Sequence, residues 1–362
     1  MSAPAYRFLH AADLHLDSPF RGLSRHDPDL ASRLRDASLV ALTRMVDLAI
    51  DRECHFVVLA GDIYDGLERG VRAQLALKRA AVGLHDAGIP LVLLHGNHDP
   101  LDLGYTAVRE WPASTHLLSA TEPEVLVLDT PAGPVTITGQ SFPDKRVERS
   151  LAAQYPPPSG PGLHVAVLHT ELVWGEGTNP YSPCRLDDLV RTGFHYWALG
   201  HVHDPRVLHH RDPVVVYPGN LQGRHFLECG PRGAMLVEGA PQALRAEHQA
   251  LAPLVFERVV VDVTELTDLT ALQKALVDAI PAHDATRLLR AELEGRSSLF
   301  EALHDAERRQ ELLVALNDAT ADDAIWMEIR SSVRPDLPWD ALAEQASLPG
   351  ELVRRELDEA EA

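Results

Sequence analysis

Apolar and polar positions recur with two different periods along the first part of the chain. In residues 30–50 and 71–87, apolar side chains recur at i, i+3, i+4 and i+7, which predicts amphipathic helices. Short continuous apolar runs such as "FVVLA" at 56–60 are typical of strands buried in a sheet. Turn residues inside apolar segments predict hairpins at 124–139 and 205–220. Alternating strands and helices predict an α/β fold over residues 1–240.

After about residue 240 the pattern predicts a second, smaller domain. Strand-like and helix-like stretches alternate there in the order β-α-β-α-β, at 254–263, 267–280, 287–295, 298–316 and 324–333. This order predicts a separate α/β domain over 254–333. The segment "RPDLP" then interrupts the pattern, and residues 334–362 form a tail in which we expect short acidic helices at 339–347 and 350–361.

Composition indicates a cytoplasmic globular protein. The 362 residues are 45% hydrophobic and 24% charged, and no run of 18 apolar residues predicts a membrane span. The first residues lack the clean apolar stretch of a signal peptide, so we do not expect secretion. The cysteines Cys54, Cys184 and Cys229 form no CxxC pair, and we expect reduced thiols in the cytoplasm.

Charge is distributed unevenly along the chain. Residues 1–240 hold 21 Lys and Arg against 28 Asp and Glu, a balance of −7. Residues 241–362 hold 12 against 25, a balance of −13, which gives the net charge of −20. Because the overall field repels a polyanion, such a substrate has to be bound locally, by metal ions or by a few arginines.

Polar residues follow the predicted strands of the first domain at the points where these strands end. They are Asp13 and His15, Asp62, Asn97 with His98 and Asp99, His169, and His201 with His203. One such residue is usually a cap or a turn residue. Because ligands of open α/β sheets bind at the carboxyl ends of strands, the repeated occurrence of His, Asp and Asn there predicts one converging metal site.

These residue types suit two transition-metal ions. Imidazole, carboxylate and amide ligands together favour manganese, iron, zinc or cobalt over calcium. Two ions roughly 3.5–4 Å apart stabilise both the attacking and the leaving oxygen of a phosphoryl displacement. Asp62 stands between the other motifs along the chain, and we expect its carboxylate to bridge the ions.

The order of these motifs resembles the calcineurin-like metallophosphoesterase superfamily over residues 6–240. The segments "FLHAADLHLDSPFRGL" and "YPGNLQGRHF" resemble, more narrowly, the SbcD-type DNA-repair exonucleases and their YhaO-like branch. This resemblance implies a β-sandwich flanked by helices (αββα), with a small C-terminal α/β domain as a capping domain.

The resemblance also implies a ligand set. One ion would be held by Asp13, His15, Asp62 and His203, and the other by Asp62, Asn97, His169 and His201. His98 would bind no metal and would instead protonate the leaving oxygen or stabilise the transition state. Asp65 matches a carboxylate that orients this histidine in relatives, although some archaeal relatives have His there. For Asp99 we favour a turn cap over a role behind the ligands.

Other residues in the resembling segments are candidates for binding substrate. We expect phosphate contacts or an ordering of the site rim from Arg21, Asn220, Arg224 and His225. In the tail, an apolar stripe either docks an SbcC-type coiled-coil ATPase or belongs to a solvated acidic segment; it comprises Leu342, Leu348, Leu352, Val353 and Leu357. Homodimers are common in this group.

The function implied is a two-metal DNA nuclease of DNA repair. It would digest DNA ends and cut single strands, with a metal-activated hydroxide as nucleophile. A phosphatase or a phosphodiesterase of small molecules such as cyclic nucleotides is the alternative on the same fold. Gly66 occupies the place of an Arg of protein phosphatases and opposes this alternative, whereas the net charge of −20 favours it. A non-catalytic scaffold that docks an ATPase is a further alternative, which the complete ligand set and His98 oppose.

Overall fold

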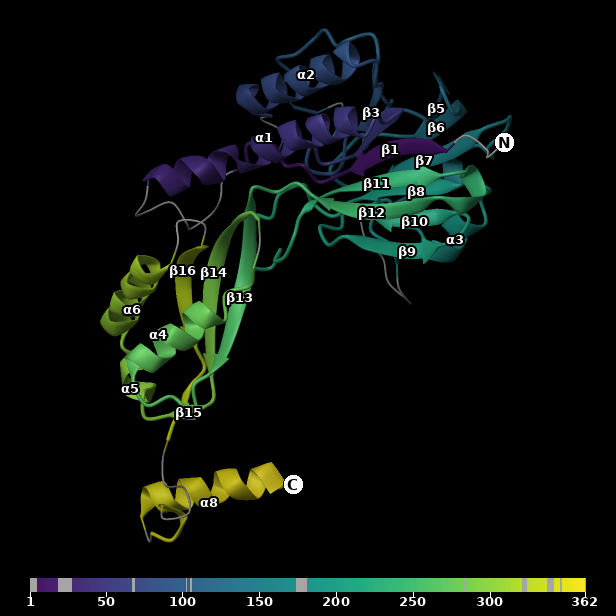
Figure 1. Cartoon of the computed structure of the whole chain (residues 1–362). Helices are drawn as coiled ribbons and strands as arrows, with labels where there is room; N and C mark the ends of the chain where they lie inside the picture. Colours follow the sequence, from purple (N-terminus) through teal and green to yellow (C-terminus); the bar gives the residue numbers. More distant parts are fainter. Residues whose placement is uncertain are drawn as a thin grey trace. The chain divides into compact units, whose positions relative to one another are not determined.

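A computed structural model describes residues 5–18, 28–66, 69–101, 103, 104, 106–173, 181–282, 284–320, 324–336, 342–345 and 347–361. The chain divides into two compact units, Met1–Phe256 and Glu257–Ala362 (Figure 1). Within the described residues, no helix combines the length and apolar character that a membrane crossing requires.

The first unit begins with alternating strands and helices and continues mostly as strands. Its helices are α1 (Pro28–Asp51), α2 (Val71–Asp86) and α3 (Leu186–Val190). Its strands are β1 (Tyr6–Ala11), β2 (Phe56–Ala60), β3 (Leu91–Leu94), β4 (Thr115–Leu117), β5 (Glu124–Thr130), β6 (Gly133–Gly139), β7 (Leu163–His169), β8 (Tyr196–Gly200), β9 (Arg206–His210), β10 (Val214–Tyr217), β11 (Gly233–Gly239) and β12 (Arg245–Ala250).

These strands form two mixed sheets. In the first the order is β12-β11-β1-β2-β3-β4, and β1 to β4 run parallel. In the second the order is β5-β6-β7-β8-β10-β9, and β6, β7, β8 and β10 run parallel. The carboxyl ends of β1, β2 and β3 therefore share one edge of the first sheet, and those of β6, β7 and β8 share one edge of the second.

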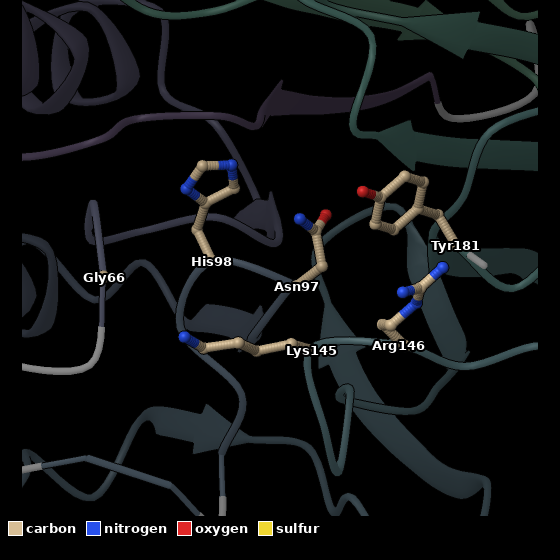
Figure 2. Close-up of a pocket in the computed structure, with 6 residues that line it drawn as sticks. All are labelled: Gly66, Asn97, His98, Lys145, Arg146 and Tyr181. Carbon is tan, nitrogen blue, oxygen red and sulfur yellow. The ribbon is translucent and has the colours of Figure 1, made fainter.

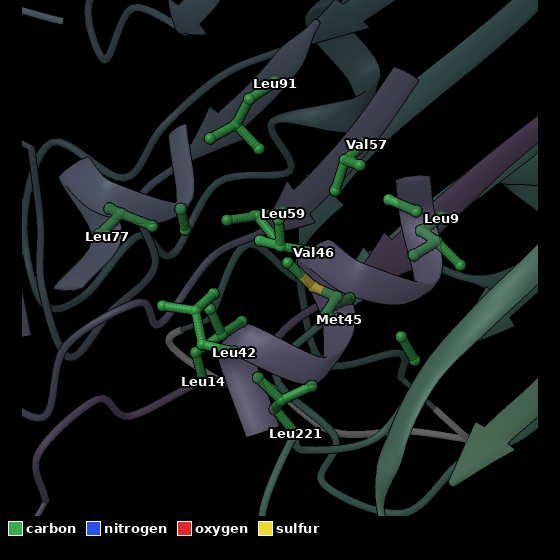
Figure 3. Packing of buried hydrophobic residues seen from close by; sticks show 14 of the residues in the cluster. Leu9, Leu14, Leu42, Met45, Val46, Val57, Leu59, Leu77, Leu91 and Leu221 are labelled. Atoms are coloured by element: carbon green, nitrogen blue, oxygen red, sulfur yellow. The ribbon is translucent and has the colours of Figure 1, made fainter. Parts of the chain in front are cut away.

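Apolar layers hold the sheets and helices together. Between the sheets, Phe8 of β1 stacks on Phe56 of β2 with ring centroids 4.5 Å apart, and Tyr196 of β8 meets Phe8 edge-on at 5.2 Å. Leu9 and Leu59 point from the other face of the first sheet toward α1 and α2 (Figure 3). Because β1, β2 and β3 are covered on both faces, their sequences are apolar almost throughout.

The outer face of the second sheet is also covered. Trp197 of β8 packs there with Phe142, Tyr155 and Leu189 of α3. The layers are thus helix, sheet, sheet and covering helix, and the predicted αββα sandwich is confirmed.

The second unit is the small α/β fold that the alternating pattern predicts. Its strands are β13 (Leu254–Asp262, which begins in the first unit), β14 (Thr286–Glu294), β15 (Arg296–Ser297), β16 (Ala324–Ser331) and β17 (Arg334–Pro335). Its helices are α4 (Leu269–Asp278), α5 (Phe300–His304), α6 (Ala306–Ala319) and α8 (Leu348–Glu361). The order β13-β14-β16, with β14 parallel to β16, gives a sheet whose core contains Leu272, Leu316 and Trp326.

One predicted helix is broken in the structure. The stretch 298–316 forms α5 and α6 instead of one helix, because Asp305 adopts extended backbone between them. Its side chain accepts a hydrogen bond from the backbone N–H of Arg308 at 3.0 Å and so caps α6. Leu303 and Ala306 stand on either side of Asp305 at helical spacing, so periodicity alone does not indicate the break.

The tail contains one described helix, α8. The helix predicted at 339–347 falls partly outside the described residues, and the side chain of Leu357 lies outside them altogether. Of the predicted apolar stripe, Leu348 and Leu352 are 74% and 55% exposed, whereas Val353 is buried. Two of these side chains therefore face solvent in the isolated chain.

Candidate dinuclear metal site

Loops that follow five strands bring the predicted ligands together. Asp13 and His15 follow β1, Asp62 follows β2, Asn97 and His98 follow β3, His169 ends β7, and His201 and His203 follow β8. The backbone N–H of Asp13 bonds to the Gly61 carbonyl at 3.0 Å, and that of His15 bonds to the Asp62 carbonyl at 3.1 Å. The loops after β1 and β2 are thus fixed to each other.

The backbone at these ligands is unusual. Asp13, His15, Asp62 and His201 have φ of 51°, 42°, 49° and 103°, in a region that side chains other than glycine seldom adopt. Such strain persists where surrounding contacts impose it, and it is concentrated at functional sites. Gly96 is required for a steric reason, because a Cβ there would overlap Asp62 Oδ1.

Asp13, His15 and His203 form the first group of ligand atoms. The Nε2 atoms of His15 and His203 lie 3.2 Å apart, and His203 Nε2 lies 3.8 Å from Asp13 Oδ1. His203 Nδ1 donates to Glu228 Oε1 at 2.6 Å, so Nε2 is the ring nitrogen that remains for a cation. Imidazole nitrogens that face each other beside a carboxylate fit a cation between them.

The second group contains Asp62, His169, His201 and Asn97. Asn97 Oδ1 lies 2.9 Å from His169 Nε2 and 3.0 Å from His201 Nδ1. His169 Nδ1 donates to the Ala60 carbonyl at 3.0 Å, so Nε2, on the side of Asn97, is the ring nitrogen that would offer a lone pair to a cation once deprotonated. An amide oxygen and a ring nitrogen that both offer lone pairs fit a shared cation.

Asp62 lies between the two groups. Its Oδ2 is 3.5 Å from His169 Nε2 and 3.9 Å from His15 Nε2. Its Oδ1 accepts the backbone N–H of His98 at 2.9 Å, which fixes the carboxylate. The donor set therefore fits a pair of divalent cations with Asp62 in the position of a shared ligand.

Burial and neighbouring charges shift the pKa values of these groups in opposite directions. Burial raises the pKa of Asp13. Burial acts the same way on Asp62, but the imidazoles of His169, His15 and His98 together outweigh it and hold the pKa of Asp62 well below its usual range. At His169 burial lowers the pKa, yet the charge of Asp62 raises it to about 9. Burial lowers the pKa of His201 to about 3. Because ligands must be deprotonated, bound cations would replace the shared protons of this cluster.

His98 contacts Asp65 at the mouth of the site. His98 Nδ1 lies 3.1 Å from Asp65 Oδ1, and Asp65 Oδ2 accepts the hydroxyl of Ser18 at 2.6 Å. The hydrogen bond to Asp65 raises the pKa of His98, against the effect of burial. The His98 side chain is 45% exposed, and with Asn97 it lines an open cavity of about 420 Å³ (Figure 2). His98 is thus the imidazole that a substrate in this cavity can reach.

The matching family model is that of the calcineurin-like phosphoesterases, which covers residues 6–205. The chain belongs to this family. An uncharacterized metallophosphoesterase YhaO of Bacillus subtilis is 34% identical over 337 residues, 88% of this chain and 82% of that protein. The resemblance drawn from the motifs is therefore confirmed, and the chain is a metal-dependent phosphoesterase.

More distant relatives carry names from DNA repair. The DNA double-strand break repair protein Mre11 of Sulfurisphaera tokodaii is 25% identical over 67% of this chain and 55% of its own length. The nuclease SbcCD of Bacillus subtilis has a component that is 22% identical over 65% of this chain and 66% of its own length. The phosphoesterase chain thus spans only about half to two thirds of these two proteins.

Asp99 of this phosphoesterase accepts hydrogen bonds from the backbone of its own loop and of the loop after β2. It is fully buried, and its carboxylate accepts the backbone N–H groups of Gly96, Ile63 and Tyr64 at 2.9, 3.0 and 3.1 Å. The ring of His95 lies 2.7 Å from the same carboxylate. This agrees with a turn cap, and it also ties the loop after β3 to the loop after β2.

The four candidate substrate-binding residues lie in different surroundings. Asn220 is fully buried, and its amide donates to Gln222 O and to Glu228, both at 2.9 Å. Arg224 Nη1 lies 3.7 Å from Asp65 Oδ1, at the rim. His225 is exposed there. Arg21 lies outside the described residues.

Motif spacing did not indicate Glu228. This residue is 5% exposed. Its carboxylate accepts hydrogen bonds from His203 Nδ1 at 2.6 Å, from the backbone N–H of Arg224 at 2.7 Å and from the Asn220 amide at 2.9 Å. Burial alone would raise its pKa, but the hydrogen bond from His203 and the charge of Arg224 hold the pKa at about 2. A single Glu in a loop between β10 and β11 carries no sequence signal, although it stands only three residues after His225.

Lys145, Arg146 and Tyr181 also line the cavity and were not indicated by the motifs (Figure 2). Lys145 and Arg146 belong to the loop after β6. Because β6 runs parallel to β7, this loop leaves the sheet at the same edge as His169. A basic pair six and seven residues after a predicted strand was the available signal.

Proposed function

We propose that the chain is a phosphodiesterase acting on DNA, an exonuclease on DNA ends that also cuts single strands, in DNA repair. The observation that carries this proposal is the contact of His98 with Asp65, beside groups of His and Asp that could hold two ions; His98 also lines the open cavity. The printed names of the Mre11 and SbcCD relatives support DNA as the substrate.

The proposed ligand sets follow the two groups. Asp13, His15, Asp62 and His203 hold one ion, and Asp62, Asn97, His169 and His201 hold the other. Manganese is the first choice, and iron, zinc and cobalt suit the same donors. When bound, two such ions supply Lewis-acid stabilisation of the phosphoryl oxygens and lower the pKa of water.

His98 has the proposed role of general acid. Its Nδ1 is held by Asp65, which leaves Nε2 toward the cavity. In hydrolysis water adds to phosphorus, the bond from phosphorus to the leaving oxygen breaks, and the proton at His98 Nε2 passes to that oxygen. Asp65 favours the protonated ring and fixes its orientation, so it acts as a positioning residue.

A small-molecule phosphodiesterase is the second candidate. The net charge of −20 favours it, because the field of the whole chain opposes a long polyanion. In the described part of the cavity lining, Gly66 stands where the protein-phosphatase pattern places an Arg, which argues against a phosphatase. A scaffold without activity would turn over no phosphodiester.

Partners, the role of the second unit, oligomeric state and cellular location are further parts of this proposal. DNA and an SbcC-type ATPase are the proposed partners, and the exposed side chains of Leu348 and Leu352 suit docking of the ATPase on the tail. Residues 254–333 are proposed to act as the capping domain. Homodimer formation and a cytoplasmic location are proposed from the resemblance and from the composition.

The test is manganese-dependent digestion of end-labelled linear duplex DNA, with covalently closed circular duplex as the parallel substrate. We expect loss of the linear DNA alone, and no loss with His98→Ala. If both DNAs survive in a preparation that hydrolyses bis(p-nitrophenyl) phosphate, the small-molecule phosphodiesterase takes the place of the nuclease.

A further inference from the structure

Lys145 and Arg146 form one side of the cavity into which the candidate site opens. Asn97 and His98 line the same cavity (Figure 2). The basic side chains come from the loop after β6, whereas Asn97 and His98 come from the loop after β3. The cavity therefore has the candidate catalytic groups and a cationic pair in its lining, on loops of different sheets.

The two cationic side chains are available to a ligand. Both are exposed, and within the described part of the chain neither side chain takes part in an ion pair. The unit that contains them has more acidic than basic residues. Two adjacent unpaired cations at this cavity therefore make it locally positive on a unit whose net charge is negative. Arg149, in the same loop, is exposed as well but does not line the cavity.

The cavity is larger than one phosphate requires. Its volume of about 420 Å³ falls within the range of roughly 300–1,000 Å³ for pockets that hold ligands of drug size. The ligand groups and His98 already provide for the reacting phosphate. Lysine binds phosphate as a point charge and arginine as a two-pronged donor, so the pair suits a further anionic oxygen group.

We propose that Lys145 and Arg146 bind the phosphate next to the scissile one, so that the site selects oligonucleotides over isolated phosphodiesters. This inference rests on the proposed function as a phosphodiesterase of nucleic acid. It names the substrate class as a strand with successive phosphates, and it assigns the selection to two residues outside the ligand motifs.

The experiment measures binding and turnover separately. The full-length double variant Lys145→Gln/Arg146→Gln is compared with wild type and with Arg149→Gln, the matched control from the same loop. Binding of fluorescent (dT)12 is followed by anisotropy in Ca²⁺ at several salt concentrations, and turnover of bis(p-nitrophenyl) phosphate is followed in Mn²⁺.

We expect the double variant to bind (dT)12 about tenfold more weakly or worse. The slope of log K against log salt should fall in magnitude by about 0.7, since each phosphate neutralised on a single strand contributes about 0.7. Turnover of bis(p-nitrophenyl) phosphate should stay within about twofold in all three proteins. Arg149→Gln should bind (dT)12 as wild type does.

Three results would overturn the subsite. They are an unchanged salt slope in the double variant, an equal loss in Arg149→Gln, or a parallel loss of bis(p-nitrophenyl) phosphate turnover. The proposed function fails in a different way: wild type would bind (dT)12 through this pair and yet leave DNA uncut in Mn²⁺. If wild type cuts DNA and the double variant binds it equally well, the subsite alone is wrong.

Discussion

The strand ends and the loop between β10 and β11 contribute to the same site in different ways. Asp13, Asp62 and His169 are placed by the sheets, because parallel strands bring their carboxyl ends to one edge. Glu228 reaches His203 from an irregular loop whose conformation depends on the amide of Asn220 and the N–H of Arg224. Sheet topology thus places the candidate ligands, and a loop fixes the orientation of one of them.

The largest effect is expected at a strand end. Asp62→Ala removes the carboxylate that lies between both groups, so we expect loss of both ions and a fall in bis(p-nitrophenyl) phosphate turnover of more than about 10³-fold. Metal content by mass spectrometry and initial rates measure this. Asp129→Asn, on an exposed strand position, is the matched control and should retain both ions.

A smaller effect is expected in the loop. Glu228→Gln keeps the shape of the side chain but removes the negative charge that accepts the hydrogen bond from His203 Nδ1. Metal affinity and turnover should therefore fall by about 10- to 100-fold. Competition with a fluorescent chelator measures the affinity. Exposed Glu247→Gln serves as control. If Glu228→Gln lost as much metal affinity and turnover as Asp62→Ala, the proposed difference between residues that hold the ions and a loop that only orients one of them would be wrong.

The smallest effect separates two histidines that follow each other along the first strand and its loop. His10, inside β1, is buried, with its ring 3.0 Å from the Tyr196 hydroxyl and 3.1 Å from the Leu199 carbonyl. His15 lies beyond the strand end, among the ligands. Burial lowers the pKa of His10 to about 3, below the ordinary 6.5 of an unfolded chain.

Because the unfolded chain binds a proton below pH 6.5 and the folded one does not, His10 makes the free energy of unfolding decrease as pH falls from 6.5 toward 3. Between pH 7.5 and 5.5 the contribution is about 1.4 kcal/mol. Urea unfolding of wild type and His10→Gln in the presence of a chelator measures it. The variant should lose about this much of the pH dependence, and an unchanged dependence would contradict a neutral buried His10.

Sequence reasoning predicted most of the sheets, and the gathering of the candidate ligands at the strand ends, for one physical reason. Continuous apolar runs mark buried strands, and a polar residue directly after such a run has its position fixed by the sheet. The proximity of Asp65 to His98 followed from family spacing. In contrast, the buried state of Asn220 and the approach of Glu228 to His203 depend on how an irregular loop packs, and no period in the sequence records that.

Two further features were not predicted from the sequence, for related reasons. The break at Asp305 is a local capping contact, which the spacing of apolar residues on its two sides does not indicate. To predict that Lys145 and Arg146 line the cavity, one has to know that β6 pairs with β7 in parallel. This pairing joins strands that are distant in sequence. Local patterns thus predicted elements and their ends, and tertiary pairing decided which loops meet.

The most direct test of the central claim is the metal content and turnover of His98→Ala. The account predicts two Mn²⁺ per chain in both the variant and wild type, together with a loss of bis(p-nitrophenyl) phosphate turnover of about 10²- to 10⁴-fold. A variant that loses its metal ions, or one that retains both ions and full turnover, would contradict the division between ligand residues and a proton-donating His98.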